Sequence, residues 1–113
     1  MPHLRFSGLN TDSVQNISKP LVDDLAKLLD CPRDYFTLEL LSMEFIFDGR
    51  LGGNRYPMVD VSWFDRGQTI QNQAAGIITH TIRSELGNND ELDICVRFST
   101  FDPKRYYENG EHF

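Results

Sequence analysis

Two short stretches decide the fold: Pro2-His3-Leu4-Arg5-Phe6-Ser7 near the start of the chain and Pro57-Met58-Val59-Asp60-Val61-Ser62 near its middle. Each begins with proline and ends with serine, and apolar residues recur at every second position between them, which is typical of a half-buried β-strand. A helical pattern and a further strand pattern follow each stretch. The sequence therefore predicts two related β-α-β units, residues 1–56 and 57–113, within a single domain of residues 1–113.

Both helices are recognised by their apolar spacing. The first carries apolar residues at steps of three and four, which indicates an amphipathic helix: Val14, Ile17, Leu21, Val22, Leu25, Leu28 and Leu29. Asn10 or Thr11 is expected to cap it, and Pro20 predicts either a kink or a helix that is regular only from about Ser18. The second helix is expected between Gly67 and Gly87.

The remaining strands are less regular. The second is expected from about Phe36 to Phe47, and its apolar parity changes at Leu40-Leu41, which indicates a β-bulge or a bend between two strand pieces. The third is expected at 57–64 and the fourth at 92–101. Residues 48–56 contain three glycines and are expected to form a loop.

The order of these elements predicts an α+β fold. Each β-α-β crossover makes parallel, right-handed neighbours, so two units side by side give a four-stranded mixed sheet with both helices on one face. The other face would carry Arg5, Asp60, Cys95 and Arg97, a semi-polar surface that oligomerisation could cover. The ferredoxin-like sandwich and the tautomerase fold share this order, and both stay open at this point.

Composition narrows the classes of function. The chain has 113 residues and a formal net charge of −6, with no basic stripe, which argues against nucleic-acid binding. No apolar run approaches the roughly 20 residues of a membrane helix, and the N-terminus lacks the pattern of a secretory signal. Two cysteines are too few for a disulfide framework, so a cytoplasmic location is expected.

A metal site is not expected, because the three histidines have no ligand spacing with either cysteine: His3, His80 and His112. No phosphate-binding glycine pattern occurs either, so no cofactor is expected. The cations are mostly arginine, eight against three lysines. Arginine is the better bidentate ligand for carboxylates, which makes an anionic small molecule a possible partner.

The N-terminus offers the sharpest chemical feature. If the initiator methionine is removed, Pro2 becomes an N-terminal secondary amine at the mouth of a strand. Burial and nearby arginine charges would both lower the pKa of this amine, because each disfavours its charged form. A neutral amine near pH 7 is suited to act as a general base on a proton next to a carbonyl.

The sequence resembles the tautomerase superfamily, and within it the macrophage migration inhibitory factor branch and its bacterial relatives. The resemblance rests on Met1-Pro2 leading into a strand, on Cys31-Pro32-Arg33-Asp34-Tyr35-Phe36, on the helix from Gly67 to Gly87, and on the aromatic tail with Asn109-Gly110. It implies a homotrimer whose sheets form a central barrel, with a pocket at each subunit interface and the N-terminal proline at its base.

The resemblance carries over only some functional residues. Pro2 matches the family's catalytic proline. Where the branch has a lysine after the first helix this sequence has Cys31, and Arg33 stands two residues later. Where the last strand of the branch has a tyrosine and an asparagine, this sequence has Cys95 and Arg97. Arg66 falls in a loop that lines the pocket in the family.

Two hypotheses of different classes follow. The first is a cofactor-free tautomerase-like isomerase in which Pro2 moves a proton on a small α-keto acid or dienol carboxylate. Arg97, with Arg33 or Arg66, would hold the carboxylate of this substrate. The alternative is a trimeric binding or interaction protein that keeps the fold without the chemistry, because the lysine and tyrosine positions are replaced. A ferredoxin-like regulatory domain, expected as a dimer, is a third possibility.

Overall fold

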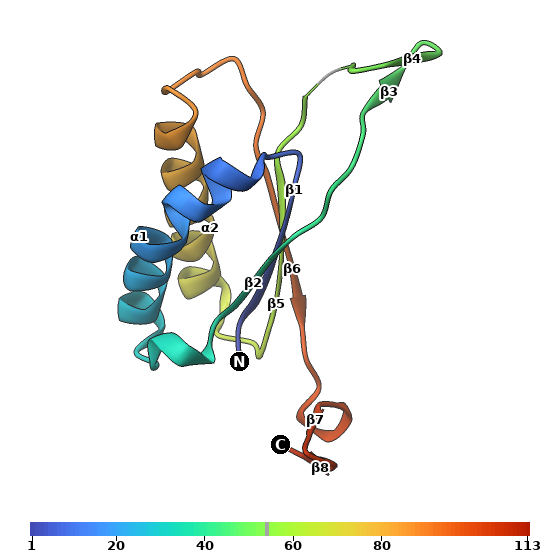
Figure 1. The fold of residues 1–113 in the computed structure, drawn as a ribbon. Helices are drawn as coiled ribbons and strands as arrows, with labels where there is room; N and C mark the ends of the chain where they lie inside the picture. The colour runs from blue at the N-terminus through green and yellow to red at the C-terminus, as the bar shows by residue number, and fades with distance from the viewer. Residues whose placement is uncertain (54) are drawn as a thin grey trace.

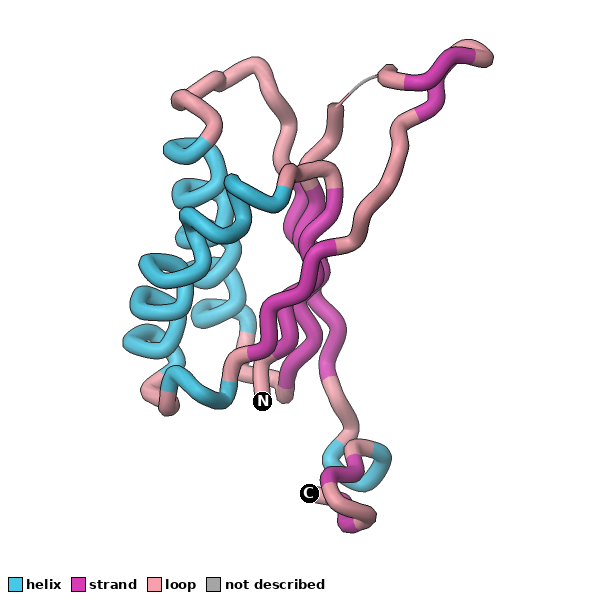
Figure 2. The backbone as a smooth tube through the Cα atoms, in the orientation of Figure 1, coloured by secondary structure: helices cyan, strands magenta, loops and turns pink. Residues whose placement is uncertain are grey.

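The computed structural model describes residues 1–53 and 55–113. Its main elements occur in the order β1 (His3–Ser7), α1 (Thr11–Leu29), β2 (Thr37–Leu40), β5 (Met58–Trp63), α2 (Gln68–Glu85) and β6 (Cys95–Thr100). Two short 3-10 helices, Arg33–Tyr35 and Pro103–Arg105, precede β2 and the tail. Both long helices lie on the same side of the sheet (Figures 1 and 2). The predicted α+β arrangement is thus confirmed.

The sheet has the strand order β2-β1-β5-β6. The first strand is parallel to β2 and antiparallel to β5, and β5 is parallel to β6. Each β-α-β unit therefore forms a pair of adjacent parallel strands, and the two units join through β1 and β5. In a ferredoxin-like sandwich a further strand separates the two strands of each unit, so this strand order excludes that alternative.

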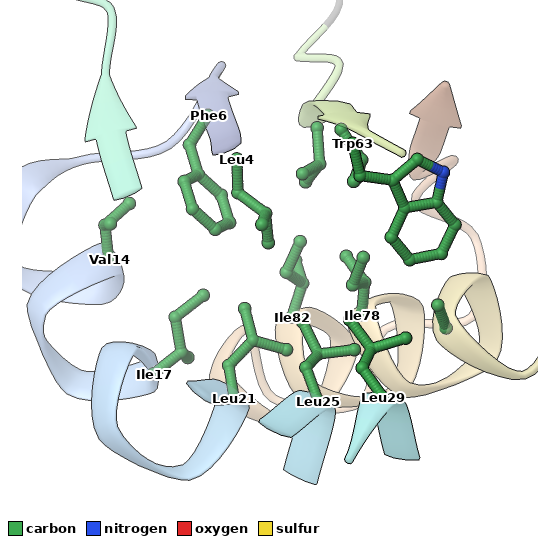
Figure 3. Packing of buried hydrophobic residues seen from close by; sticks show 13 residues of the cluster. Leu4, Phe6, Val14, Ile17, Leu21, Leu25, Leu29, Trp63, Ile78 and Ile82 are labelled. Carbon is green, nitrogen blue, oxygen red and sulfur yellow. The ribbon is translucent and has the colours of Figure 1, made fainter. Parts of the chain in front are cut away.

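One hydrophobic core lies between the sheet and the helices (Figure 3). It consists of alternate residues of β1 and β5 together with the inner stripes of both helices: Leu4, Phe6, Val14, Ile17, Leu21, Leu25, Leu29, Val59, Val61, Trp63, Ala74, Ile78 and Ile82. The period of two in the strands and of 3.6 in the helices places these side chains on facing surfaces. The apolar stripe predicted for α1 matches this set, apart from the partly buried Leu28 and the buried Val22 outside the cluster.

The first helix begins where the sequence predicted. The side chain of Asn10 accepts a hydrogen bond from the backbone N–H of Ser13 at 2.8 Å, which decides the N-cap in favour of Asn10 over Thr11. The helix runs through Pro20 without interruption, so the start near Ser18 is wrong. It ends at Asp30, whose backbone is left-handed with φ of 51°.

The second strand is shorter than predicted. Pairing of β2 with β1 ends at Leu40, and the chain then leaves the sheet instead of continuing as a strand to Phe47. The parity change at Leu40-Leu41 marks this departure. A separate hairpin follows, β3 (Ile46–Phe47) with β4 (Arg50–Leu51), so the loop expected at 48–56 begins inside a hairpin. Asn54 of that loop lies outside the described residues.

The last strand of the sheet also has different bounds from those predicted, and a hairpin follows it in the C-terminal tail. The fourth strand of the sheet spans Cys95–Thr100 rather than 92–101. Beyond it, β7 (Tyr107–Glu108) and β8 (Glu111–His112) pair across Asn109-Gly110, both with positive φ, as expected for an Asn-Gly turn. Figure 1 shows this tail below the sheet and the β3–β4 hairpin above it. In the part of the chain that is described, no helix has the length and apolar character to cross a bilayer.

Candidate active site at the N-terminus

Pro2 lies immediately before β1 and its side chain is fully buried. Its carbonyl accepts a hydrogen bond from the N–H of Thr37 at 3.0 Å, so the sheet holds it from one side. On the other side, the pairing of His3 with Ser62 places Pro2 opposite Trp63, whose side chain is equally buried. Pro2 is therefore fixed at the point where β1, β2 and β5 meet.

The charged groups around the N-terminus include one of the predicted arginines. Burial lowers the pKa of the Met1 amine most strongly, and the positive charge of Arg66 lowers it further. Cys31 and Glu108 act in the opposite direction. Arg66 itself donates from Nη1 to the carbonyl of Leu29 at 3.2 Å, at the C-terminal end of α1. The charges of Cys31, Arg66 and Glu108 thus all act on the Met1 amine; we call these four residues and Pro2 the N-terminal cluster.

Arg97 lies elsewhere in the same chain. It sits in the middle of β6 on the face without helices, where its register partner is Asp60 and the partner of Asp60 is Arg5. Arg97 is separated from Pro2 by three residues along the strand direction and by two strands across the sheet. At ~3.3 Å per residue and ~4.8 Å per strand, the two backbones are about 14 Å apart. Arg97 therefore does not belong to the N-terminal cluster of its own chain.

Arg33 is also engaged away from the N-terminal cluster. Its Nε lies 2.6 Å from Oδ1 of Asp23 on α1. A shallow groove along the outer edge of β2 is lined by Arg33 together with residues of α1 and β2: Ser18, Lys19, Val22, Phe36 and Leu38. Of the three arginines that the sequence suggested for a carboxylate, only Arg66 acts through its charge on the N-terminal amine.

Sequence reasoning missed an aromatic cluster next to Pro2. Nε2 of His3 lies 3.0 Å from the hydroxyl of Tyr106, and the rings of the cluster lie 4.6–6.2 Å from their neighbours. Its members are His3, Phe64, Phe101, Tyr106 and Phe113. Burial raises the pKa of Tyr106, and Glu108 adds to this, so the phenol stays protonated. The cluster fastens the C-terminal tail to the start of β1.

Cys95 occupies the opposite end of the sheet. It pairs with Met58, near the end of β1 that is farthest from Pro2. A hydrogen bond between Cys95 and the hydroxyl of Tyr56, followed by the negative charges nearby, raises the pKa of Tyr56. Neither cysteine forms a disulfide. Among residues 1–53 and 55–113, no group of histidine, cysteine and acidic side chains has the arrangement of a metal site.

A sheet of two parallel pairs joined through an antiparallel centre, two helices on one face, and a buried proline at the start of the first strand define a class of protein. Solved structures that share this fold include a macrophage migration inhibitory factor-like protein from Entamoeba histolytica, at a TM-score of 0.74 and 11% identity over 99% of this chain and 98% of that one. Fused 4-OT and Pt0534 share it at TM-scores of 0.80 and 0.74 and at 12% and 15% identity. The chain has the fold of the tautomerase superfamily.

Within that class, the chain belongs to the family described as Domain of unknown function (DUF1904), which matches residues 1–112. It is similar to a protein of unknown function from Vibrio cholerae O1 biovar eltor, at 37% identity over 99% of this chain and 87% of that one, with a TM-score of 0.86. It is also similar to a DUF1904 protein from Sebaldella termitidis, at 29% identity over the whole of both chains and a TM-score of 0.86. No curated protein shows significant similarity to the sequence.

Proposed function

We propose that this protein is a tautomerase-like isomerase whose general base is the amine of Pro2, exposed when Met1 is removed. One observation carries the proposal: a buried proline stands next to an N-terminal amine whose pKa is lowered by burial and by Arg66. Loss of Met1 would convert the nitrogen of Pro2 from an amide into a secondary amine within the same surroundings. Those surroundings favour its neutral, proton-accepting form.

The reaction that this arrangement supports is a proton shift on a small α-keto acid or dienol carboxylate. The amine of Pro2 would take a proton from the carbon beside the carbonyl, or from the enol oxygen in the reverse direction. It would then return the same proton to the other atom of the conjugated system, so no oxidant or second reactant is needed. Arg66 would bind the carboxylate and stabilise the negative charge that develops on oxygen.

The named properties of two proteins of the same fold support this choice of substrate and assembly. Pt0534 was solved after inactivation by 2-oxo-3-pentynoate, which is an α-keto acid. A fused 4-OT was solved as an asymmetric trimer. We propose that this chain likewise forms a homotrimer, located in the cytoplasm, in which a neighbouring subunit completes the pocket around Pro2. Arg97, which cannot reach Pro2 in its own chain, would contribute to that pocket from the neighbour.

The first experiment is the intact mass of the purified protein, which shows whether Met1 has been removed. The second is the rate of tautomerisation of phenylpyruvate and of 2-hydroxymuconate by the wild type, by Pro2→Ala and by Arg66→Gln. We expect Pro2→Ala to lose most of the activity and Arg66→Gln to raise KM more than it lowers kcat. A variant with one extra residue before Pro2 is the matched control, since it keeps the ring but blocks the amine. Activity that is unchanged in Pro2→Ala would refute the proposal.

A second candidate function is favoured by the ion pairs. Arg33 and Arg97 are both engaged by carboxylates of their own chain. Cysteine also stands at both positions where the macrophage migration inhibitory factor branch has a lysine and a tyrosine. A trimeric binding protein without proton transfer fits these features. It predicts a retained Met1, saturable binding of a small carboxylate, and no tautomerisation of either substrate.

A further inference from the structure

A cavity of about 600 Å³ lies at the end of the sheet that is farthest from Pro2. Its walls come from residues 45–47 at the β3–β4 hairpin, from residues 55–56 before β5, and from residues 91–93 between α2 and β6. Figure 1 shows the hairpin and the connection between α2 and β6 above the sheet, on the side away from the N-terminus. Small-molecule sites commonly have volumes of roughly 300–1,000 Å³, a range that includes this cavity.

Three aromatic side chains line the cavity: Phe45, Phe47 and Tyr56. Ile46 and Leu92 add aliphatic surface. Phe47 and Tyr56 are 61% and 41% exposed, so a ligand that covers them removes apolar surface from water, which is favourable. The face of an aromatic ring also carries partial negative charge and attracts a cation within about 6 Å. This lining therefore favours a ligand with an apolar body and a positive charge.

Two carboxylates line the same cavity, those of Glu91 and Asp93. Neither takes part in an ion pair among the residues that the structure describes. Their segment is held by hydrogen bonds from Nη1 of Arg83 to the carbonyls of Asn89 and Leu92, at 2.7 and 3.0 Å. The N–H of Glu91 also donates to Oδ1 of Asn89 at 3.0 Å. The backbone that carries both carboxylates is thus fixed in advance, which lowers the ordering cost of binding.

The charge of the lining favours a cation over an anion. Arg55 is the one cation among the described lining residues, and its Nε donates to the carbonyl of Gly8 at 3.5 Å, toward the loop between β1 and α1. Two carboxylates against one guanidinium leave an excess of one negative charge. A hydrogen bond with Cys95 is the largest cause that raises the pKa of Tyr56, and the negative charge of Asp93 adds to it. The phenol therefore stays neutral at physiological pH.

We propose that this cavity is a binding site for a small aromatic amine. The ammonium group would lie beside Glu91 and Asp93, and the aromatic body would cover Phe47 and Tyr56. The five residues of β1 separate the cavity from Pro2 by roughly 17 Å at ~3.3 Å per residue. The proposal does not depend on the chemistry of Pro2. An inactive protein that binds the amine would agree with it, and an active tautomerase that does not bind the amine would contradict it.

The first test compares two probes of the same shape by titration calorimetry at neutral pH. The first probe, 2-phenylethylamine, carries an ammonium group, and 2-phenylethanol has a neutral hydroxyl in its place. We expect saturable binding of the amine, roughly fivefold or more tighter than that of the alcohol. Equal affinity for the two probes, or no saturation with the amine, would overturn the proposal.

Amide chemical shifts locate the bound amine in the same protein. We expect the largest changes at residues 45–47, 55–56 and 91–93, with little change at His3 and Thr37 beside Pro2. Largest changes around Pro2 would contradict the proposed location, because the amine would then occupy the other end of the sheet.

The carboxylates are tested by substitutions that keep their shape. In the double variant Glu91→Gln with Asp93→Asn, we expect affinity for the amine to fall to that for the alcohol, while affinity for the alcohol stays unchanged. Asp90→Asn is the matched control, because Asp90 precedes Glu91 in the chain but does not line the cavity. Unchanged affinity for the amine in the double variant, or an equal loss in Asp90→Asn, would refute the role of the two carboxylates.

The aromatic lining is tested at Phe47. Phe47→Leu keeps an apolar side chain but removes the ring, so we expect it to reduce the preference for the amine over the alcohol about twofold or more. Tyr107→Leu is the matched control, because Tyr107 is also 61% exposed and belongs to the C-terminal tail. The same reduction in both variants would contradict a specific contact between the amine and the ring of Phe47.

Discussion

Arg97 is held by Asp60 through two parallel hydrogen bonds, from Nε to Oδ1 at 2.7 Å and from Nη2 to Oδ2 at 3.0 Å. This hydrogen bonding, followed by the charge of Asp60, raises the pKa of Arg97. Two of the five guanidinium N–H groups are used in this way, which leaves three for another acceptor. Asp60 thus fixes the direction in which Arg97 offers its remaining donors.

Replacing Asp60 by asparagine should weaken assembly without destabilising the fold. The pair is solvent-exposed, so we expect Asp60→Asn to leave thermal unfolding by circular dichroism almost unchanged. Assembly of the proposed homotrimer should weaken, because Arg97 would reach the neighbouring subunit's pocket and its guanidinium loses its fixed direction. Sedimentation velocity at low and high salt checks this, and the difference between the proteins should shrink at high salt. A large loss of thermal stability at both salt concentrations would contradict the assignment.

Arg66 should control the pKa of the N-terminal amine. In protein that retains Met1, burial is the larger cause of the lowered pKa and Arg66 the second, so Arg66→Gln should raise this pKa part of the way toward its ordinary value. Arg66→Lys keeps the charge and is the control. The pH dependence of the reaction of the amine with an acylating reagent measures the change; equal pKa values in all three proteins would contradict it.

The same shift has a consequence for stability. Because the folded protein holds this amine less tightly protonated than the unfolded chain does, the unfolded state binds more protons between the two pKa values. The free energy of unfolding should therefore rise with pH through that interval and level off above the ordinary pKa of the amine. Arg66→Gln should narrow the interval, as measured by urea unfolding at several pH values.

Gly8 should tolerate no side chain. Its φ is +74°, and a Cβ there would stand 2.5 Å from the backbone oxygen of Tyr56. We expect Gly8→Ala to lower the free energy of unfolding by roughly 2 kcal/mol or more, since rigid backbone must move. Gly76→Ala is the contrasting variant, because its position in α2 has open space and helical geometry. It should raise the free energy of unfolding by about 0.5–1 kcal/mol.

Tyr106 should hold the tail against β1. Tyr106→Phe keeps the ring in the aromatic cluster but removes its hydrogen bond to His3. We expect a local loss of about 1 kcal/mol, seen as faster hydrogen exchange in residues 101–113 with little change in α1. Tyr107→Phe is the control, because Tyr107 is 61% exposed. Equal exchange rates in the two variants would show that packing alone holds the tail.

Much of the fold could be predicted because the signals are local. The alternation of apolar and polar residues in β1 and β5 and the apolar stripe of α1 predicted the sheet and the helix that packs on it. The Asn-Gly pair predicted the turn in the C-terminal tail. The β3–β4 hairpin was not predicted, although Asp48-Gly49 is a turn signal of the same kind as Asn109-Gly110, with positive φ at both residues. The parity change at Leu40 showed that something ended there, but not that the chain leaves the sheet, because that depends on pairing with β1.

The site could be predicted less completely because its contacts join distant residues. His3 and Tyr106 are 103 positions apart, and the partners of Arg33 and Arg97 lie on other elements. Composition and spacing select arginine as a carboxylate ligand but do not reveal which arginines are already engaged. Pro2 as a base, Arg66 as a ligand and the two related halves 1–56 and 57–113 stay predictions.

Trp63 is an intrinsic fluorescent probe of this protein. It is the chain's single tryptophan, its side chain is 2% exposed, and its Nε1 is the one buried side-chain nitrogen or oxygen without a hydrogen-bond partner in the part of the chain that the structure describes. Figure 3 shows its indole at one end of the core, and the ring lies 5.0 Å from that of Phe98. An indole in such apolar surroundings should emit at short wavelength. Because Pro2 lies opposite it across the strands, the intensity of this emission can report events at the N-terminus without any label.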